Sequence, residues 1–310
     1  MNREEFPIQI DDEESIRVDR FVASLGLFTR SQISQRSVTV KDPGGQVLKL
    51  SKRLKNGDQV VVEWDDPPSS EILPESMDLD IVYEDDHCIV VNKMQGVVVH
   101  PAYGHIHGTL VQGLLFRYAE MEKAFGGDRV RPGVVHRLDK DTSGLLIAAR
   151  DVETLAALSR QFSDRSVKKT YLAIVRGKLP LAEGEIDLSI GRDPRDRKKF
   201  AVNVRNSRAA LTRYRVLAVS KGYSLVQLRI LTGRTHQIRV HLLSQGCPIL
   251  GDPIYSRRDT GFPDSTLMLH SWKLSIQVPG VGKKRFLAPL PEHFSEILSE
   301  LDIDHFSSEV

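Results

Sequence analysis

The chain has 310 residues, of which 40% are hydrophobic and 27% charged, and its formal net charge is +2. This composition is that of a folded globular protein and excludes collagen-like, disulfide-scaffold and intrinsically disordered classes. The first 15 residues carry a net charge of −5 and the last 20 carry −6, so residues 16–290 carry +13. A basic body of this kind is compatible with a nucleic-acid partner, although the total charge is nearly neutral.

Cysteine usage and apolar run length indicate the compartment. Cys88 and Cys247 lie far apart, with no second Cys or His at a metal-ligand spacing, so no structural zinc site is predicted. The N-terminus is acidic, unlike a signal peptide, and no apolar run approaches the roughly 20 residues that a membrane helix needs. We expect a cytoplasmic protein without a membrane partner, and nothing in the sequence requires more than a monomer.

A small N-terminal domain is predicted over residues 16–66. Val18, Phe21, Val22 and Leu25 have the spacing of one helical face, and extended segments follow at 38–40 and 59–64. Nine Lys and Arg fall between positions 17 and 55, among them the candidate RNA contacts Arg30 and Lys52. A compact α/β module with this excess predicts an RNA-binding domain, and a solvated basic face is the alternative.

Residues 67–80 are rich in Pro, Ser and acidic residues and predict a linker, followed by a large domain over 81–290 and an acidic tail over 291–310. Strands are expected at 81–83, 88–92, 133–136, 145–148, 170–175, 211–219 and 223–231. Helices are expected at 109–119, at 151–162 with Asp151 as N-cap, and at 235–245 between Thr235 and Gly246. Many strands with few helices predict an α+β domain with a mostly antiparallel mixed sheet.

The densest polar segment is RPGVVHRLDKDTSGLLIAAR, over residues 131–150. A buried-type strand delivers Arg137 and Asp139 into a turn, and a second apolar strand leaves it. Turn building alone explains one or two of these polar residues. The accumulation of His, Arg, Asp, Lys, Thr and Ser in one turn favours a catalytic loop held between rigid strands.

A second polar segment, LTGRTHQIRVH over residues 231–241, leads from a Gly turn into a helix. Arg234 and Arg239 are compatible with a solvated basic helix, with an anion clamp, or with a partner for a buried carboxylate. Tyr171 lies on the predicted strand KKTYLAIVRG, where packing is its ordinary role. No GxxxxGK[ST], GxGxxG or GxSxG motif is present, so no nucleotide cofactor and no serine-hydrolase elbow is indicated.

Basic residues are concentrated over positions 192–215, where nine Lys or Arg and two Asp give a net charge of +7. Arg195, Arg197 and Lys198 are the candidate phosphate contacts of this run. Such a run is often a solvated loop, but the charge density favours contact with RNA phosphates.

HRLDKDTSG, KKTYLAIVRG and LTGRTHQIRVHLLSQGCPILGD, in this order after the small domain, resemble the RluA-type pseudouridine synthases. The opening of the large domain, YEDDHCIVVNKMQGVVVHPAYGHIHGTLV, matches the same family. The small domain resembles the S4-type RNA-binding domain. The resemblance extends from about residue 80 to 290, together with the N-terminal domain.

The resemblance implies isomerisation of uridine to pseudouridine in RNA, with no cofactor and no metal. The family's catalytic Asp matches Asp139, its active-site Tyr matches Tyr171, and the basic residue that pairs with the Asp matches Arg239. Arg137 would fill the space that a flipped-out base leaves, and Leu250 would form an apolar wall of the pocket. Arg239 is expected to keep Asp139 ionised in a dry site.

The RNA substrate is not fixed by these motifs. The S4-type domain favours large-subunit ribosomal RNA, with transfer RNA as the alternative. A non-catalytic RNA-binding factor of ribosome assembly is the alternative from another class, and it would not need Asp139, Tyr171 and Arg239 together.

Overall fold

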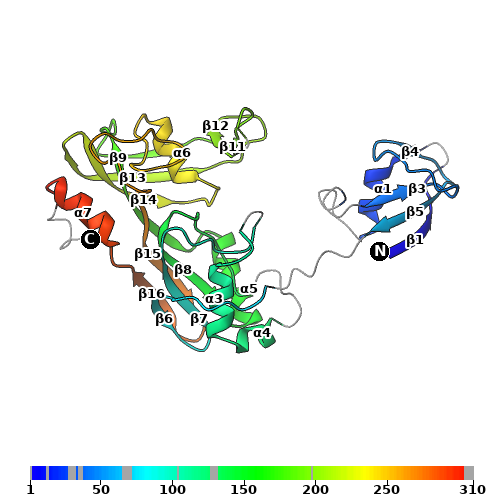
Figure 1. Cartoon of the computed structure of the whole chain (residues 1–310), viewed down its shortest axis with the longest axis horizontal. Helices are drawn as coiled ribbons and strands as arrows, with labels where there is room; N and C mark the ends of the chain where they lie inside the picture. The colour runs from blue at the N-terminus through cyan, green and yellow to red at the C-terminus, as the bar shows by residue number, and fades with distance from the viewer. Residues whose placement is uncertain are drawn as a thin grey trace. The chain divides into compact units, whose positions relative to one another are not determined.

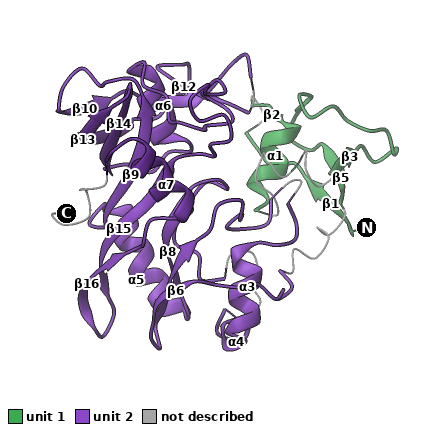
Figure 2. Cartoon of the chain, turned by 60° about the vertical axis from the view of Figure 1, so that its left-hand side comes forward, with its two compact units in different colours: residues 1–71 green, residues 72–310 purple. Residues whose placement is uncertain are grey.

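The chain is described by a computed structural model that covers residues 2–11, 14–26, 33, 38–64, 72–102, 105–125, 132–196 and 198–303. It divides into two compact units, residues 1–71 and 72–310 (Figure 2). Each unit has its own hydrophobic core. The boundary falls within the segment predicted to be a linker.

The small unit is built on a three-stranded antiparallel sheet in the order β1-β5-β3. Its elements are β1 (Asn2–Pro7), β2 (Ile16–Arg17), α1 (Val18–Ser24), β3 (Thr39–Lys41), β4 (Arg53–Leu54) and β5 (Gln59–Trp64). The predicted helix is α1, whose Val18, Phe21 and Val22 are buried in the core. The predicted start at residue 16 is too late, because β1 pairs with the whole of β5, from Asn2 opposite Trp64 to Pro7 opposite Gln59.

The large unit contains a nine-stranded sheet among its described residues. Its strands are β6 (Ile81–Glu84), β7 (Cys88–Lys93), β8 (Ser143–Ala149), β9 (Lys168–Arg176), β10 (Glu183–Asp187), β13 (Leu211–Ser220), β14 (Tyr223–Ile230), β15 (Leu269–Val278) and β16 (Gly282–Leu287). The order is β10-β13-β14-β9-β15-β8-β7-β6, with β16 paired to β15. The β15–β8 pair is parallel, and the other pairs are antiparallel. The predicted α+β class with a mostly antiparallel mixed sheet is confirmed.

The large unit also contains the helices α3 (Leu110–Arg117), α4 (Glu120–Ala124), α5 (Val152–Ser163), α6 (Gln237–Ser244) and α7 (Glu292–Glu300), and a hairpin of β11 (Ile190–Arg192) and β12 (Phe200–Val202). Helix α6 contacts β12 and β13, whereas α5 contacts β8 and β15 (Figure 1). Among the described residues, no helix is long and apolar enough to cross a membrane.

The predicted strand at 133–136 is wrong. Val134 makes only an isolated bridge to Ala148, and the chain is otherwise without regular structure from there to Asp139. The His136 side chain explains the interruption, because its Nε2 accepts the N–H of Ile147 at 3.1 Å. That N–H is therefore not available for a main-chain bond to the 133–136 segment. The segment can accordingly turn away toward the site.

Helix ends agree with the sequence at two positions and differ at a third. Asp151 caps α5, since its carboxylate accepts the N–H of Thr154 at 2.7 Å. Gly246 directly follows Gln245, the C-cap of α6, and its φ of +71° suits glycine. The predicted N-cap of α6, Thr235, is wrong: the cap position is His236, in the left-handed region at φ +57°.

The segments on either side of the predicted large domain belong to its core. Ile72 is buried there, and the N–H of Glu75 donates to the carbonyl of Gln112 in α3, so residues 72–80 are not a free linker. Residues 291–303, expected in an acidic tail, contain α7. Phe294, together with Ile297 and Leu298 three and four positions later, forms a buried apolar face that the acidic composition conceals.

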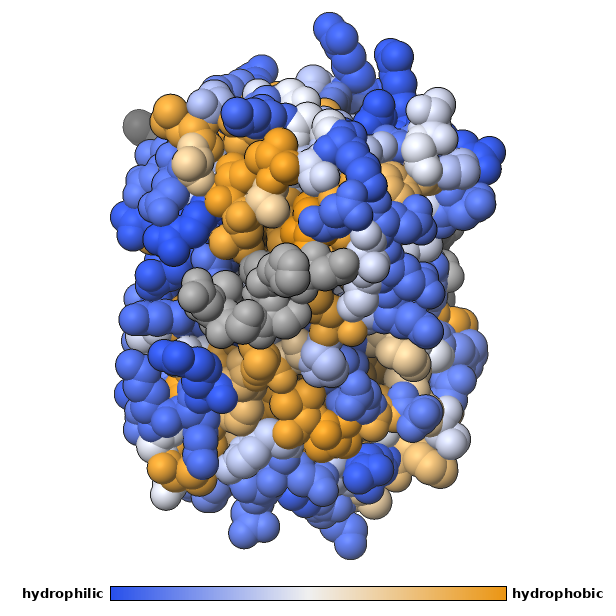
Figure 3. All heavy atoms as spheres, turned by 90° about the vertical axis from the view of Figure 1, so that its left-hand side faces the viewer, coloured by the Kyte–Doolittle hydropathy of each residue, from blue (hydrophilic) through white to orange (hydrophobic). Residues whose placement is uncertain are grey.

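The surface of the large unit is mixed in character. Hydrophilic residues dominate the edges of the face shown in Figure 3, and hydrophobic residues gather nearer its middle. Scattered exposed apolar side chains, such as Leu181 and Val219, are ordinary in a globular protein.

Phe294→Ala tests whether α7 belongs to the large unit. Truncating this 1%-exposed side chain should lower the free energy of unfolding by about 3–5 kcal/mol. The measurement is urea denaturation in a Trp64→Phe background, where fluorescence reports only Trp272 of β15. The exposed Ser295→Ala should change stability by no more than about 0.5 kcal/mol. Equal effects of the two substitutions would show that α7 is not part of this folding unit.

Candidate active site

A cavity of about 490 Å³ in the large unit brings together residues of the polar segments 131–150 and 231–241 and of the strand that carries Tyr171. Five of the predicted site residues line it: Arg137, Asp139, Tyr171, Arg234 and Arg239. Arg137 and Asp139 lie before β8, and Tyr171 lies on β9. Arg234 lies in the β14–α6 connection, and Arg239 lies on α6. The fold thus brings to one pocket residues that are 100 positions apart in the chain.

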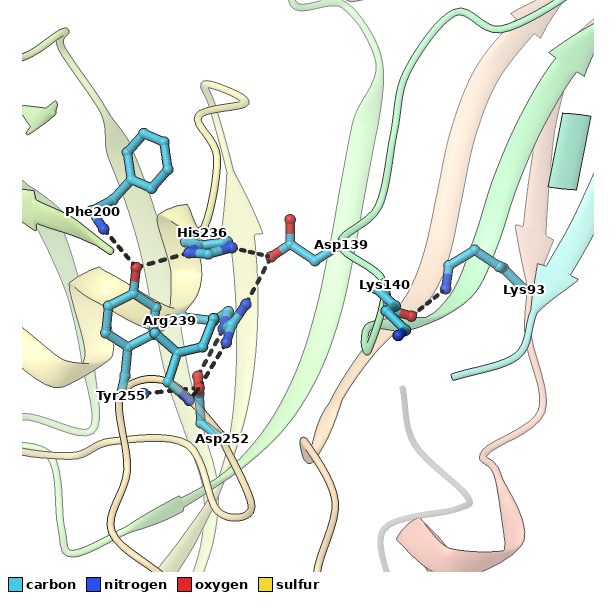
Figure 4. A network of polar contacts seen from close by, with 9 residues as sticks. Lys93, Asp139, Lys140, Phe200, His236, Arg239, Asp252 and Tyr255 are labelled. Atoms are coloured by element: carbon cyan, nitrogen blue, oxygen red, sulfur yellow. Dashed lines mark hydrogen bonds and ion pairs between the residues drawn. The ribbon is translucent and has the colours of Figure 1, made fainter. Parts of the chain in front are cut away.

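Asp139 presents its two carboxylate oxygens differently. Oδ2 accepts a hydrogen bond from Nη1 of Arg239 at 3.3 Å and lies 3.9 Å from Nε2 of His236. The other oxygen points away from both side chains (Figure 4). Among the described residues, no other side chain donates to this carboxylate, so one oxygen is left to face a ligand.

Arg239 is held from behind by a second carboxylate. Its Nε and Nη2 donate to the two oxygens of Asp252, each at 2.7 Å, and both side chains are almost fully buried (Figure 4). Asp252 also accepts the N–H groups of Ile254 and Tyr255. Burial alone would lower the pKa of Arg239, but its bonds to Asp252 and the charge of Asp139 raise it, so the guanidinium stays charged.

Asp252 is a residue that the sequence did not single out. An Asp after Gly in PILGD has the composition of a turn, and no spacing rule connects it to Arg239 thirteen positions earlier. Arg239 itself was predicted with a buried carboxylate as one possible partner, and the structure gives it two. The bidentate pair fixes the orientation in which Arg239 reaches Asp139.

Tyr171 projects from the centre of the sheet into the cavity. It lies on β9 opposite Leu228 of β14 and Ser271 of β15. Burial strongly raises the pKa of its hydroxyl, with a hydrogen bond to Ser271 opposing and Asp139 adding to the shift. The phenol is therefore protonated near neutral pH, and its ring forms part of the pocket wall.

Lys93, also absent from the sequence prediction, braces the turn that carries Asp139. Its ammonium, at the end of β7, donates to the carbonyl oxygens of Met94, Val97 and Lys140, each at 2.9 Å. The side chain is 2% exposed. Burial lowers its pKa to about 8, and the nearby Asp141 and Asp139 oppose that shift. A buried cation thus ties the residue after Asp139 to the core.

His236 belongs to a hydrogen-bonded chain that leads to the β11–β12 hairpin. Its Nδ1 is 2.8 Å from the Tyr255 hydroxyl, which accepts the N–H of Phe200 at 2.8 Å (Figure 4). The Phe200 ring also contacts the edge of His236 and lies under the guanidinium of Arg192. The base of the basic hairpin is therefore in contact with the cavity wall.

The predicted RNA-contact residues fall in different places. Arg137 is exposed at the cavity, and Arg234 is half-buried, donating to the carbonyl of Ala209. Arg195 and Lys198 are exposed on the loop between β11 and β12 and do not line the cavity. Lys52 is exposed on the small unit. Arg30 and Arg197 lie outside the described residues.

Two of the expectations need correction. Leu250 is not a wall of this cavity: it is fully buried in the core, where its N–H donates to Ile174. The basic run at 192–215 is also less positive than its composition indicates. Arg213 and Arg215 form ion pairs with Glu185 and Glu183 across the β10–β13 pair, because strand register places opposite charges side by side.

The described part of the chain holds no cluster of three or more His, Cys, Asp or Glu side chains placed to share a metal ion. The cavity brings together one carboxylate, a charged guanidinium and a protonated phenol. Such a site can stabilise or capture a cationic carbon centre while holding a flat ligand against the Tyr171 ring.

Comparison with known proteins identifies relatives along most of the chain. A family profile described as RNA pseudouridylate synthase matches residues 87–244. The chain is 42% identical over 293 residues to "Ribosomal large subunit pseudouridine synthase D" of Borreliella burgdorferi, covering 93% of this chain and 90% of the relative. It is 40% identical over 297 residues to an uncharacterised RNA pseudouridine synthase of Bacillus subtilis, covering 94% and 96%. The solved structure of human RNA Pseudouridylate Synthase Domain Containing 1 is similar with a TM-score of 0.57 and 30% identity, covering 73% of this chain and 87% of that one.

The buried Lys93 predicts a pH-dependent stability. Its folded pKa of about 8 is below the ordinary 10.5, so between these values the unfolded chain binds the proton that the folded chain has lost. The free energy of unfolding should therefore rise with pH in this window, by up to about 1.4 kcal/mol per pH unit relative to Lys93→Met. Urea denaturation of both proteins between pH 7 and 10, in the Trp64→Phe background, measures it. Parallel pH profiles would contradict the assignment.

Proposed function

We propose that this chain, which belongs to the RNA pseudouridylate synthase family, isomerises uridines of large-subunit ribosomal RNA with Asp139 as the reacting carboxylate. That it is an RNA pseudouridine synthase follows from the family. The choice of Asp139 is supported by one observation above all: a carboxylate with one oxygen held by Arg239 and the other unengaged, in a pocket that also contains Tyr171.

The reaction needs these groups for reasons of bonding. The bond between the anomeric carbon of ribose and nitrogen 1 of uracil breaks, and a bond from the same carbon to carbon 5 of uracil forms. Asp139 bonds to the anomeric carbon, or stabilises its positive charge, while the uracil leaves as an anion. The base rotates, carbon 5 attacks, the carboxylate is displaced, and the hydrogen of carbon 5 leaves as a proton while nitrogen 1 gains one. The net change is an isomerisation that consumes no cofactor.

The pocket must hold a detached uracil and admit a base that is normally stacked. The Tyr171 ring gives a flat surface against which the free base can rotate without escaping. Extruding a nucleotide from a helix costs a few kcal/mol. Arg137, exposed at the cavity, is placed to occupy the space that the base leaves, and the basic hairpin loop with Arg195 and Lys198 supplies phosphate contacts.

Ribosomal RNA is favoured as the substrate because a relative that is 42% identical over nearly its full length is named for the ribosomal large subunit. The small unit, a separate compact α/β body preceding the catalytic domain, resembles an S4-type RNA-binding domain and is proposed to add affinity for structured RNA. Specificity for one uridine depends on RNA shape and on single-stranded loops, so transfer RNA is a defined outcome of the test.

The proposal is tested by replacing the chromosomal gene with one that encodes the Asp139→Asn variant. Pseudouridines are then mapped in the total RNA of the host. The amide cannot act as the carboxylate, so one or more pseudouridines should disappear from large-subunit ribosomal RNA. Asp141→Asn, in the same turn, is the matched control and should leave them in place. Loss only from transfer RNA would overturn the substrate assignment. An unchanged map with Asp139→Asn would overturn the catalytic role.

A further inference from the structure

His236 has an unusual backbone for a histidine at the start of a helix. Its φ and ψ are +57° and 20°, a left-handed conformation in which Asn, Asp and His are tolerated better than most residues. The neighbouring Gln237 side chain holds this backbone in place, because its amide oxygen accepts the N–H of Arg234 and the hydroxyl of Thr232. Its amide nitrogen donates to Leu211 and Thr212. Backbone strain that is maintained by so many bonds at the rim of a cavity indicates a function for the side chain.

The hydrogen bonds around the ring determine which nitrogen carries the proton. The Tyr255 hydroxyl oxygen accepts a hydrogen bond from the backbone N–H of Phe200, and a backbone N–H can only donate. Among the described residues, Nδ1 of His236, 2.8 Å away, is the one acceptor within reach of the hydroxyl hydrogen, so the hydroxyl is fully hydrogen-bonded when Nδ1 accepts. A neutral His236 with an accepting Nδ1 has its proton on Nε2. The chain of donors from the hairpin to the ring therefore selects one tautomer.

The selected N–H is directed at Asp139. Nε2 lies 3.9 Å from Oδ2, the same oxygen that accepts from Arg239 (Figure 4). Burial lowers the pKa of His236, Asp139 opposes this shift, and the charge of Arg239 adds to it, so the ring is neutral at physiological pH. A shift of about 1 Å converts the contact into a hydrogen bond. Two donors then converge on one carboxylate oxygen from two sides.

We propose that His236 is a positioning residue of the reaction, whose Nε2–H donates to Oδ2 of Asp139 once RNA occupies the pocket and keeps the other oxygen turned toward the ribose. The assignment rests on the proposed role of Asp139. The assignment also connects the basic loop that carries Arg195 and Lys198 to Asp139. Phe200, whose N–H donates to Tyr255, is the first residue of β12 and follows that loop directly. RNA bound to that loop would therefore be connected, through the Phe200 N–H and the Tyr255 hydroxyl, to the His236 ring.

Two conservative substitutions separate this role from a structural one. In His236→Gln the side-chain amide nitrogen can take the place of Nε2, whereas in His236→Asn the shorter amide reaches only the Nδ1 position. The proposal predicts a single-turnover rate within about threefold of wild type for His236→Gln and a rate lower by about 10- to 100-fold for His236→Asn. Asn is favoured over Gln in a left-handed backbone. A purely structural role therefore predicts the reverse order, and that result would overturn the proposal.

The tautomer can be measured without any substrate. Nitrogen-15 chemical shifts of the His236 ring in the full-length protein should show a protonated Nε2 and an unprotonated Nδ1, and Tyr255→Phe should weaken that preference. A ring protonated on Nδ1 would overturn the proposal even if both variants folded poorly. A wild-type protein inactive on large-subunit ribosomal RNA, with the Nε2 proton in place, would instead count against the proposed substrate, so the two failures are distinguishable.

Discussion

Arg239 lies between two carboxylates, and the difference between its two contacts shapes the whole site. The bidentate pair with Asp252 is short and buried, so it largely compensates the several kcal/mol that burial of the guanidinium costs. Asp139 receives a single longer bond from the same group. Its negative charge is therefore oriented without being fully neutralised, and one oxygen stays available for a carbon centre in the pocket.

The sheet and its connections supply the rigidity that this arrangement needs. Asp139 lies just before β8 and is braced through Lys93 at the end of β7, whereas Tyr171 projects from β9. Strand β15 pairs with both β8 and β9, so the carboxylate and the phenol are fixed to the same three strands. Helix α6 adds Arg239 from the opposite side of the cavity. Small displacements among these groups would lower a rate that depends on alignment.

Features that arise from neighbouring residues or from a sequence motif could be predicted from the sequence. Features that arise from contacts between residues far apart in the chain could not. The helical spacing of Val18, Phe21 and Val22 and the cap Asp151 were readable because their causes lie within one turn. The partners Asp252 and Lys93 were not, since their roles arise only where the fold brings them to Arg239 and to the Asp139 turn. The acidic composition of their segments concealed β1 and α7. A count of charges overstated the net positive charge of the basic run, because Arg213 and Arg215 are paired with Glu residues across strands.

Asp252 sets the orientation in which Arg239 holds Asp139. Asp252 does not line the cavity, and its side chain is connected to the site through Arg239 and through the N–H of Tyr255. The most direct test is the single-turnover rate of pseudouridine formation by Asp252→Asn, measured alongside its affinity for the same RNA. We expect a rate lower by about tenfold or more, with affinity for the RNA changed by less than about threefold. A wild-type rate in a folded Asp252→Asn protein would contradict this expectation.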